Sequence, residues 1–171
     1  MTGIRNWVYT LSCLCLMVSC LTAQETEVTD DGMSKLLHRY NRMSVPYLSV
    51  ESLKMDYDQY KILDTRKKEE YEVSHLPGAI WVGEKLNTDL LPDLSNDQKI
   101  LVYCSVGVRS EDFGEELQEL GYTEVYNLYG SIFAWKNAGF TVVNNNGQVT
   151  EKVHTYNKYW SRFLMKGEPV Y

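Results

Sequence analysis

Short apolar runs alternate with mixed polar and apolar segments between residues 45 and 143. The run Lys-Ile-Leu-Val-Tyr at 99–103 is almost uninterrupted, which is typical of a strand buried on both faces of a sheet. Strands that alternate with helices favour parallel pairing, because each crossover returns the chain to the same end of the sheet. The pattern therefore predicts an α/β domain with a mostly parallel sheet and helices on both faces.

Helices and strands follow from the same pattern and from the residues that end each element. Gly121 and Gly139 follow two helical segments where a left-handed residue commonly ends a helix. The predicted strands cover 47–50, 61–63, 79–82, 99–103, 124–128 and 141–143. The predicted helices cover 34–42, 49 or 51 to 55, 67–71, 90–94, 110–120 and 131–137.

The first 23 residues have the features of a secretory signal peptide. Arg5 precedes an apolar run over 7–18, and small residues follow as far as Ala23. The run is too short for a relaxed membrane span, which takes roughly 20 residues. We expect an exported protein of the bacterial periplasm, with cleavage after Ala23.

A second processing site overlaps the first. Met17-Val18-Ser19-Cys20 resembles a bacterial lipobox, in which Cys20 would carry the lipid. Membrane attachment is expected only through such an anchor. Residues 24–44 are interpreted as a linker and a short helix, 45–143 as one domain, and 144–171 as an aromatic and basic extension. The extension is interpreted as a tail packed on the domain, with a docking patch for a partner as the alternative.

Composition narrows the partners. The net charge is −6 and the pI is about 5.1, with no Lys/Arg run, so no nucleic-acid partner is expected. Of four cysteines, Cys13, Cys15 and Cys20 lie in the leader, which leaves Cys104 alone in the domain and excludes a disulfide framework there. Three scattered histidines predict neither a metal site nor a cofactor.

Cys104 follows the most apolar strand and precedes a helix that begins near Ser110. The carboxyl ends of parallel strands are where such folds bind ligands. A short loop there directs backbone N–H groups at an anion, and the helix N-terminus adds partial positive charge. Gly107 permits a tight backbone and Arg109 supplies a cation. A lowered thiol pKa and a nucleophilic Cys104 follow; the alternative is an inert core cysteine. The anion-binding loop comprises Ser105, Val106, Gly107, Val108, Arg109 and Ser110.

Other polar residues near the strand ends have structural interpretations. Asp64 and Arg66 are expected to brace neighbouring loops as an ion pair, and His75 to support the Pro77-Gly78 turn. Glu111 and Asp112 are expected to be solvated partners of the helix dipole.

Three segments resemble the rhodanese family in its motif order. One of them is the Cys104 loop. The second combines Leu-Asp-Thr-Arg at 63–66, Glu-Glu-Tyr at 69–71 and His-Leu-Pro-Gly-Ala at 75–79. The third is Gly-Ser-Ile-Phe-Ala-Trp at 130–135. The resemblance implies a five-stranded, mostly parallel sheet and a persulfide on Cys104 within the loop. Ser105 replaces a basic residue of many members, and Ser74 and Ser131 replace glycines; we expect the glycine replacements to be tolerated.

The resemblance implies a sulfurtransferase that moves sulfane sulfur from a small donor to a thiol or cyanide, with a protein persulfide as another donor. Arg109 is the one side-chain cation of the loop, which favours neutral or singly charged persulfides over doubly charged thiosulfate. A non-catalytic rhodanese-like module that binds a partner is the first alternative. A cysteine phosphatase or arsenate reductase is the second; those loops hold five residues between Cys and Arg, whereas four lie between Cys104 and Arg109.

Overall fold

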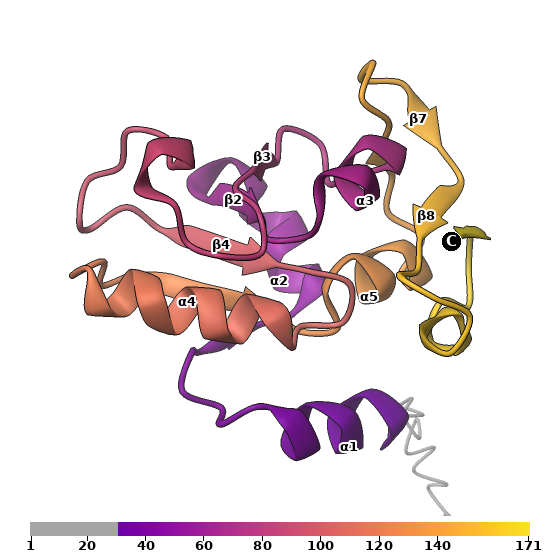
Figure 1. The fold of residues 1–171 in the computed structure, drawn as a ribbon, viewed down its shortest axis with the longest axis horizontal. Coiled ribbons are helices and arrows are strands. Elements are labelled where there is room, and N and C mark those ends of the chain that lie inside the picture. Colours follow the sequence, from indigo (N-terminus) through magenta and orange to yellow (C-terminus); the bar gives the residue numbers. More distant parts are fainter. Residues whose placement is uncertain (1–30) are drawn as a thin grey trace, which may run out of the picture.

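The computed structural model describes residues 31–171 (Figure 1). The signal peptide predicted over 1–23, with Cys20 and Ala23, lies outside these residues, as does part of the predicted linker. Within the described part of the chain, none of the helices is both long and apolar enough to cross a membrane.

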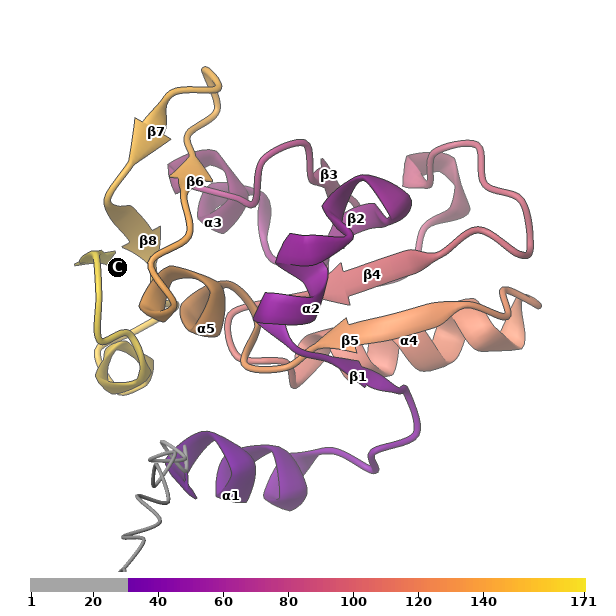
Figure 2. The same cartoon turned by 180° about the vertical axis from the view of Figure 1, so that it is seen from behind.

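Five strands form one sheet in the order β1-β5-β4-β2-β3, and every pairing in it is parallel. The strands point toward the same end of the molecule, where α5 and the C-terminal segment lie (Figures 1 and 2). The predicted α/β class with a five-stranded sheet is confirmed. The strands are β1 (Tyr47–Leu48), β2 (Lys61–Asp64), β3 (Ile80–Trp81), β4 (Ile100–Tyr103) and β5 (Val125–Leu128).

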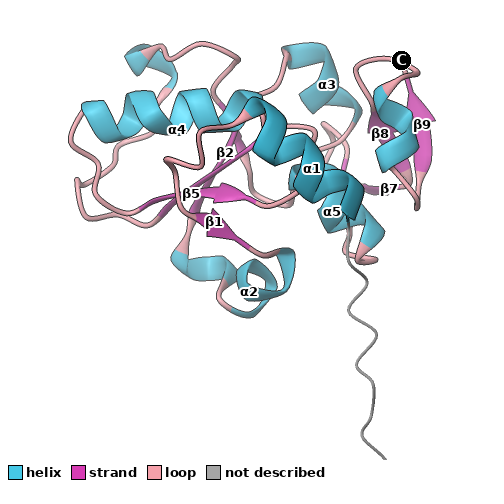
Figure 3. Ribbon diagram, turned by 90° about the horizontal axis from the view of Figure 1, so that it is seen from below, coloured by secondary structure: helices cyan, strands magenta, loops and turns pink. Residues whose placement is uncertain are grey.

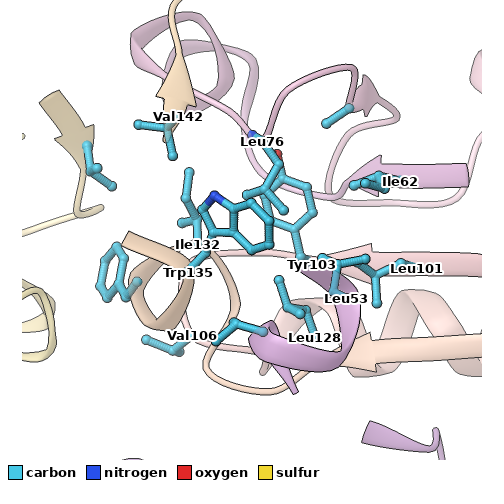
Figure 4. Packing of buried hydrophobic residues seen from close by; sticks show 14 of the residues in the cluster. Leu53, Ile62, Leu76, Leu101, Tyr103, Val106, Leu128, Ile132, Trp135 and Val142 are labelled. Carbon is cyan, nitrogen blue, oxygen red and sulfur yellow. The ribbon is translucent and has the colours of Figure 1, made fainter. Parts of the chain in front are cut away.

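Helices cover both faces of the sheet (Figures 2 and 3). Successive side chains of a strand point to opposite faces, and β4 is buried throughout, so it feeds two clusters. Ile100 and Val102 pack with Phe113 of α4 on one face. Leu101 and Tyr103 pack on the other face around Trp135 of α5 (Figure 4). The helices are α1 (Asp31–Tyr40), α2 (Val50–Met55), α3 (Lys68–Val73), α4 (Arg109–Glu119) and α5 (Ser131–Asn137).

Two predicted elements differ from the structure. Residues 90–94 are not helical; a 3₁₀ turn, η2 (Thr88–Leu90), ends there because Pro92 disfavours helical backbone at Leu91. The strand predicted over 141–143 is β6 (Val142–Val143), which lies outside the main sheet and pairs antiparallel with β7 (Val149–Thr150). The Asn-rich turn between them, with Gly147 at φ 73°, makes a hairpin.

The C-terminal segment folds back over the carboxyl end of the sheet. Its strands β8 (Lys152–His154) and β9 (Glu168–Val170) pair in parallel, and β8 lies against α3. Between them runs the 3₁₀ turn η3 (Trp160–Phe163). Another 3₁₀ turn, η1 (Tyr57–Gln59), links α2 to β2. The extension thus packs on the domain at the end of the sheet toward which β4 points (Figure 1).

Candidate active site

The candidate site is the loop that joins β4 to α4. Strand β4 ends at Tyr103 and α4 begins at Arg109, so Cys104 to Val108 turn at the carboxyl end of the central strand. The Cys104 side chain is 1% exposed, and it is the free cysteine of the described residues. The sulfur therefore sits where parallel sheets present reactive groups.

Hydrogen bonds and charge hold the Cys104 thiol in a state that favours the thiolate. The Gly107 N–H donates to Sγ at 3.2 Å. Burial alone would raise the thiol pKa, but the charge of Arg109 and hydrogen bonds from Ser110 and Gly107 outweigh it, so the pKa of Cys104 is lowered. A larger thiolate fraction at neutral pH makes the sulfur a better nucleophile.

Both the backbone conformation at position 107 and the space around it require a glycine. Its φ is 109°, a conformation that side-chain-bearing residues rarely adopt. A Cβ there would lie 3.3 Å from Leu37 of α1 and 3.4 Å from the Leu128 carbonyl oxygen. The loop therefore closes tightly against α1 and the end of β5.

Arg109 is held by carboxylates as well as by the loop. Its guanidinium donates to buried Glu70 at 2.8 and 2.9 Å, to Glu84 at 2.7 Å, and to the Ser105 hydroxyl at 2.9 Å. Burial would raise the pKa of Glu70, but Arg109, Arg66 and the Lys67 N–H lower it, so Glu70 is ionised. Two carboxylates thus compensate the one cation that the loop offers to an anionic ligand.

The carbonyl of Gly107 is fixed from two sides. Asn127 of β5 donates to it at 2.9 Å, and Asn41, just after α1, donates at 2.7 Å. The Ser110 hydroxyl donates to the side-chain oxygen of Asn127 at 2.8 Å. These bonds fix the peptide between Gly107 and Val108, directly after the residue whose N–H donates to the sulfur.

Ser131 is a site residue that the sequence interpretation missed. Its hydroxyl accepts the Cys104 backbone N–H at 3.1 Å and donates to the Leu128 carbonyl at 3.3 Å. Its φ of 51° is unusual for a residue with a side chain, and it follows Gly130 at 64°. The glycine-like backbone is kept here, and the added hydroxyl ties α5 to the reactive loop. The motif comparison contained the signal, since Ser131 stands where the family has glycine.

Asp64, Arg66 and His75 make their side-chain hydrogen bonds with one another or with Ser74, Tyr103 and Tyr71. The expected ion pair is present: Arg66 donates to Asp64 at 2.6 Å and to the Ser74 carbonyl at 2.6 Å, with both side chains fully buried. The Tyr103 hydroxyl adds a 2.6 Å bond to Asp64. His75 stacks on Tyr71, and burial lowers its pKa, which keeps the ring neutral.

Glu111 corrects one expectation. It is 2% exposed, whereas Asp112 next to it is exposed as predicted. The Glu111 carboxylate accepts from the Tyr47 hydroxyl at 2.5 Å and from Asn41 at 2.7 Å. The helix dipole alone does not explain this position: the N-terminal segment supplies donors that make burial of Glu111 favourable.

A cavity of about 290 Å³ opens beside the sulfur. Cys104, Ser105, Val106, Val108 and Arg109 supply its inner wall. Tyr40, Tyr156 and Trp160 complete the lining from the two ends of the described chain. Among residues 31–171 there is no group of three or more His, Cys, Asp or Glu side chains that could hold a metal ion.

The family model described as the rhodanese-like domain matches residues 49–138. The chain belongs to the rhodanese-like domain family. The match lies within the domain predicted over 45–143 and contains the Cys104 loop, whereas Tyr40, Tyr156 and Trp160 lie outside it. The rhodanese-like domain thus supplies the sulfur and its immediate loop, and the flanking segments supply the aromatic lining.

Relatives of the rhodanese-like domain carry several names. A thiosulfate sulfurtransferase of Coxiella burnetii is 31% identical over 75 residues, which cover 44% of this chain and 70% of that protein. A tRNA uridine(34) hydroxylase of Onion yellows phytoplasma is 37% identical over 86 residues, 43% of this chain and 26% of the relative. The YrkF protein of Bacillus subtilis is 30% identical over 98 residues, 56% of this chain and 53% of the relative. This chain therefore spans about half or less of the length of these last two relatives.

Solved structures give the same family. A rhodanese-related protein of Thermoplasma volcanium superposes with a TM-score of 0.50 at 26% identity, covering 57% of this chain and 97% of that one. A thiosulfate sulfurtransferase of Pseudomonas aeruginosa has a TM-score of 0.53 at 25% identity, covering 69% of this chain and 22% of that one. The superpositions agree with the α/β fold of the domain.

Proposed function

We propose that this rhodanese-like domain is a sulfurtransferase in which Cys104 carries the transferred sulfur. One observation carries the proposal: Cys104 lines a cavity at the carboxyl end of the central strand, where its sulfur accepts the Gly107 N–H at 3.2 Å. The lowered pKa of the thiol agrees with it. The name of the Coxiella relative agrees with this activity. Neither a metal nor an organic cofactor takes part in the proposed reaction.

The proposed reaction has two displacements at sulfur. The Cys104 thiolate attacks the outer sulfur of a donor persulfide, RSS⁻, whose S–S bond breaks to release RS⁻ and leave Cys104–S–S⁻. An acceptor thiolate or cyanide then attacks the outer sulfur of that persulfide, forms a new persulfide or thiocyanate, and regenerates the Cys104 thiolate. Fixed N–H groups and Arg109 stabilise the terminal sulfur anion, which is an electrostatic contribution.

Donor choice follows from the charge around the sulfur. Glu70 and Glu84 both bond the Arg109 guanidinium, so a doubly charged donor meets a compensated cation. A singly charged persulfide loses less hydration free energy than a dianion when it enters such a site. We therefore propose a low-molecular-weight persulfide as the donor, with a protein persulfide as the larger-partner alternative.

Intact mass spectrometry tests the assignment. The purified protein is treated with glutathione persulfide, desalted and weighed, and then exposed to cyanide. We expect the mass to rise by one sulfur atom in the wild type and to stay unchanged in Cys104→Ser. Cyanide should then remove the added sulfur and form thiocyanate. A chain that gains no sulfur from any donor would instead support the non-catalytic, partner-binding alternative.

A phosphatase is disfavoured by the loop. Four residues separate Cys104 from Arg109, and the guanidinium that would bind a phosphoryl group is already bonded to Glu70, Glu84 and Ser105. Turnover of an aryl phosphate or of arsenate by the purified protein, lost in Cys104→Ser, would reverse this preference.

We further propose that the protein is exported to the bacterial periplasm after removal of its leader. The proposal rests on Arg5, the apolar run that follows it and the two processing sites. Protein recovered from cells should lack residues 1–19 at least. Mass mapping of the N-terminus distinguishes cleavage after Ala23 from a diacylglycerol-modified Cys20, and an intact Met1 on cytosolic protein contradicts export.

A further inference from the structure

The outer rim of the cavity is aromatic and comes from outside the matched domain. Tyr40 stands at the end of α1, and Tyr156 and Trp160 belong to the segment between β8 and β9. Tyr40 is 57% exposed and Tyr156 is 46% exposed, so both rings are partly open to solvent beside Cys104, and Lys67 and Arg109 lie over the Tyr156 ring. Exposed aromatic rings that converge on a concave site commonly mark binding of an apolar group.

Tyr156 is held at the rim by its surroundings. Its φ is 64°, a conformation that costs a residue with a Cβ about 1 kcal/mol. Its N–H donates to His154 at 3.1 Å, and the preceding Thr155 is buried and bonded to the Val170 carbonyl at 2.9 Å. The ring lies over Arg109 with 5.4 Å between the guanidinium carbon and the ring centroid. A strained backbone that places an exposed ring beside the reactive loop suggests a functional role for that ring.

The inner wall of the cavity suits the same kind of group. Val106 and Val108 line it next to the sulfur, and both are aliphatic. The volume of about 290 Å³ is close to the lower end of small-ligand pockets, which start at roughly 300 Å³. The site therefore has room for a compact organic group attached to the transferred sulfur.

We propose that this cavity selects sulfane-sulfur donors that carry one negative charge and a compact apolar or aromatic group. Tyr156 and Trp160 are the positioning residues that hold this group while Cys104 attacks. The inference rests on the sulfurtransferase function proposed above and adds the substrate class. It also gives residues 144–171 a task at the site in addition to packing on the domain.

Two thiosulfonates isolate the contribution of the apolar group. Methanethiosulfonate and benzenethiosulfonate, RSO₂S⁻, are both monoanions and differ only in R. The Cys104 thiolate attacks the terminal sulfur, the S–S bond breaks, and the sulfinate RSO₂⁻ leaves with Cys104–S–S⁻ as the other product. Loading of a free small thiolate by the same two donors measures their intrinsic reactivity ratio.

The experiment measures kcat/KM of the full chain for both donors and takes the ratio of the benzenethiosulfonate value to the methanethiosulfonate value. We expect this ratio to exceed that of the free thiolate by about tenfold, as for other contacts with an apolar group. Tyr156→Gly removes the ring and suits the positive φ, so it should fold and should lower the ratio severalfold. Tyr171→Gly is the matched control, because Tyr171 is 61% exposed and lies outside the cavity lining; its ratio should stay at the wild-type value.

The outcomes separate this inference from the function on which it rests. A wild-type ratio equal to that of the free thiolate overturns the proposed selectivity while leaving sulfur transfer intact. A raised ratio that Tyr156→Gly does not change overturns the role of Tyr156. Absence of Cys104 persulfide with every donor, by mass spectrometry, overturns the sulfurtransferase itself.

Discussion

The Cys104 loop and the aromatic rim face the same cavity but are built from different interactions. The loop is buried and held by polar contacts: two amides fix the Gly107 carbonyl, and Ser131 holds the Cys104 N–H. The rim is half-exposed and held by ring contacts, such as the edge-to-face pair of Tyr159 and Trp160 at 5.3 Å. The comparison separates the two tasks that we propose: the buried loop, with Asn41 among its supports, sets the reactivity of the sulfur, and the aromatic rim selects the donor.

This difference predicts different mutational behaviour. A buried hydrogen bond that loses one partner leaves a polar group without water, so loop substitutions should affect stability and reactivity together. An exposed ring contributes less to the free energy of folding, so rim substitutions should change selectivity with little change in stability.

The largest expected effect comes from removing the sulfur itself. Cys104→Ser should abolish thiocyanate formation from persulfide and cyanide, because no other cysteine lies in the described residues. The hydroxyl is close in size to the thiol, so thermal unfolding should remain close to that of the wild type. Undiminished turnover by the folded variant would place the reaction at another group and contradict the assignment of Cys104 as the sulfur carrier.

Arg109→Ala should weaken reactivity next. Loss of the guanidinium removes a charge that lowers the pKa of Cys104, so the pKa rises and less thiolate is present at pH 7. At pH values below the thiol pKa, each unit of rise lowers the thiolate fraction, and with it the loading rate, about tenfold. Alkylation rate against pH measures the midpoint, which should move to higher pH.

Glu84 provides the matched control for Arg109. Glu84→Gln removes a carboxylate from the exposed side of the same guanidinium and keeps the Glu70 pair. The alkylation midpoint should then move to lower pH, opposite to the effect of Arg109→Ala. Identical midpoints in all three proteins would mean that backbone N–H groups alone set the thiolate.

Ser131→Ala should destabilise the loop. The buried Cys104 N–H would lose its acceptor, which costs about 1–3 kcal/mol in the free energy of unfolding. Ser131→Gly also loses the hydroxyl but relieves the φ of 51°, so it should recover about 1 kcal/mol of that loss. Chemical denaturation measures both, with exposed Ser95→Ala as the control; equal stability of all four proteins would contradict the role of the hydroxyl.

The smallest expected effect concerns charge at the boundary between loop and rim. Val108 is half-buried and lines the cavity, so Val108→Lys adds a cation where a dianion would approach. We expect methanethiosulfonate, a monoanion, to exceed thiosulfate in kcat/KM on the wild type once each value is divided by the reactivity of that donor with a free small thiolate. The variant should narrow that gap by about fivefold, the effect of one partly exposed charge. Ser105 is unsuitable for this test, because it is 5% exposed and bonded to Glu70 and Arg109. A preference of the wild type for thiosulfate would contradict the charge argument.

The sequence predicted the central strand and its loop because local signals agree there. An apolar run, one cysteine, a glycine and a helix start lie within a dozen residues, and three motifs in order carried the family resemblance. The absence of a helix over 90–94 was also readable, since Pro92 lies inside the segment.

Contacts between segments that lie far apart along the chain could not be predicted from the sequence. Ser131 meets Cys104 across 27 residues, and Glu111 meets Tyr47 across 64. A serine in place of a glycine and a glutamate in a first helical turn have ordinary local interpretations, and only the folded chain supplies their partners. The rim was missed for the same reason: Tyr40 and Tyr156 lie more than a hundred positions apart and meet at one cavity.

The pairing of β8 with β9 closes the C-terminal segment at its neck. Gly167, at φ 101°, sits at that neck, where a Cβ would lie 2.9 Å from the Glu151 carbonyl oxygen. Everything between His154 and Glu168 is therefore a lobe with fixed ends, comparable to an Ω-loop. Such a lobe can be exchanged or lengthened without shifting a strand of the sheet. If the aromatic rim selects the donor as we propose, substitutions in this lobe change the specificity while the reactive centre stays the same.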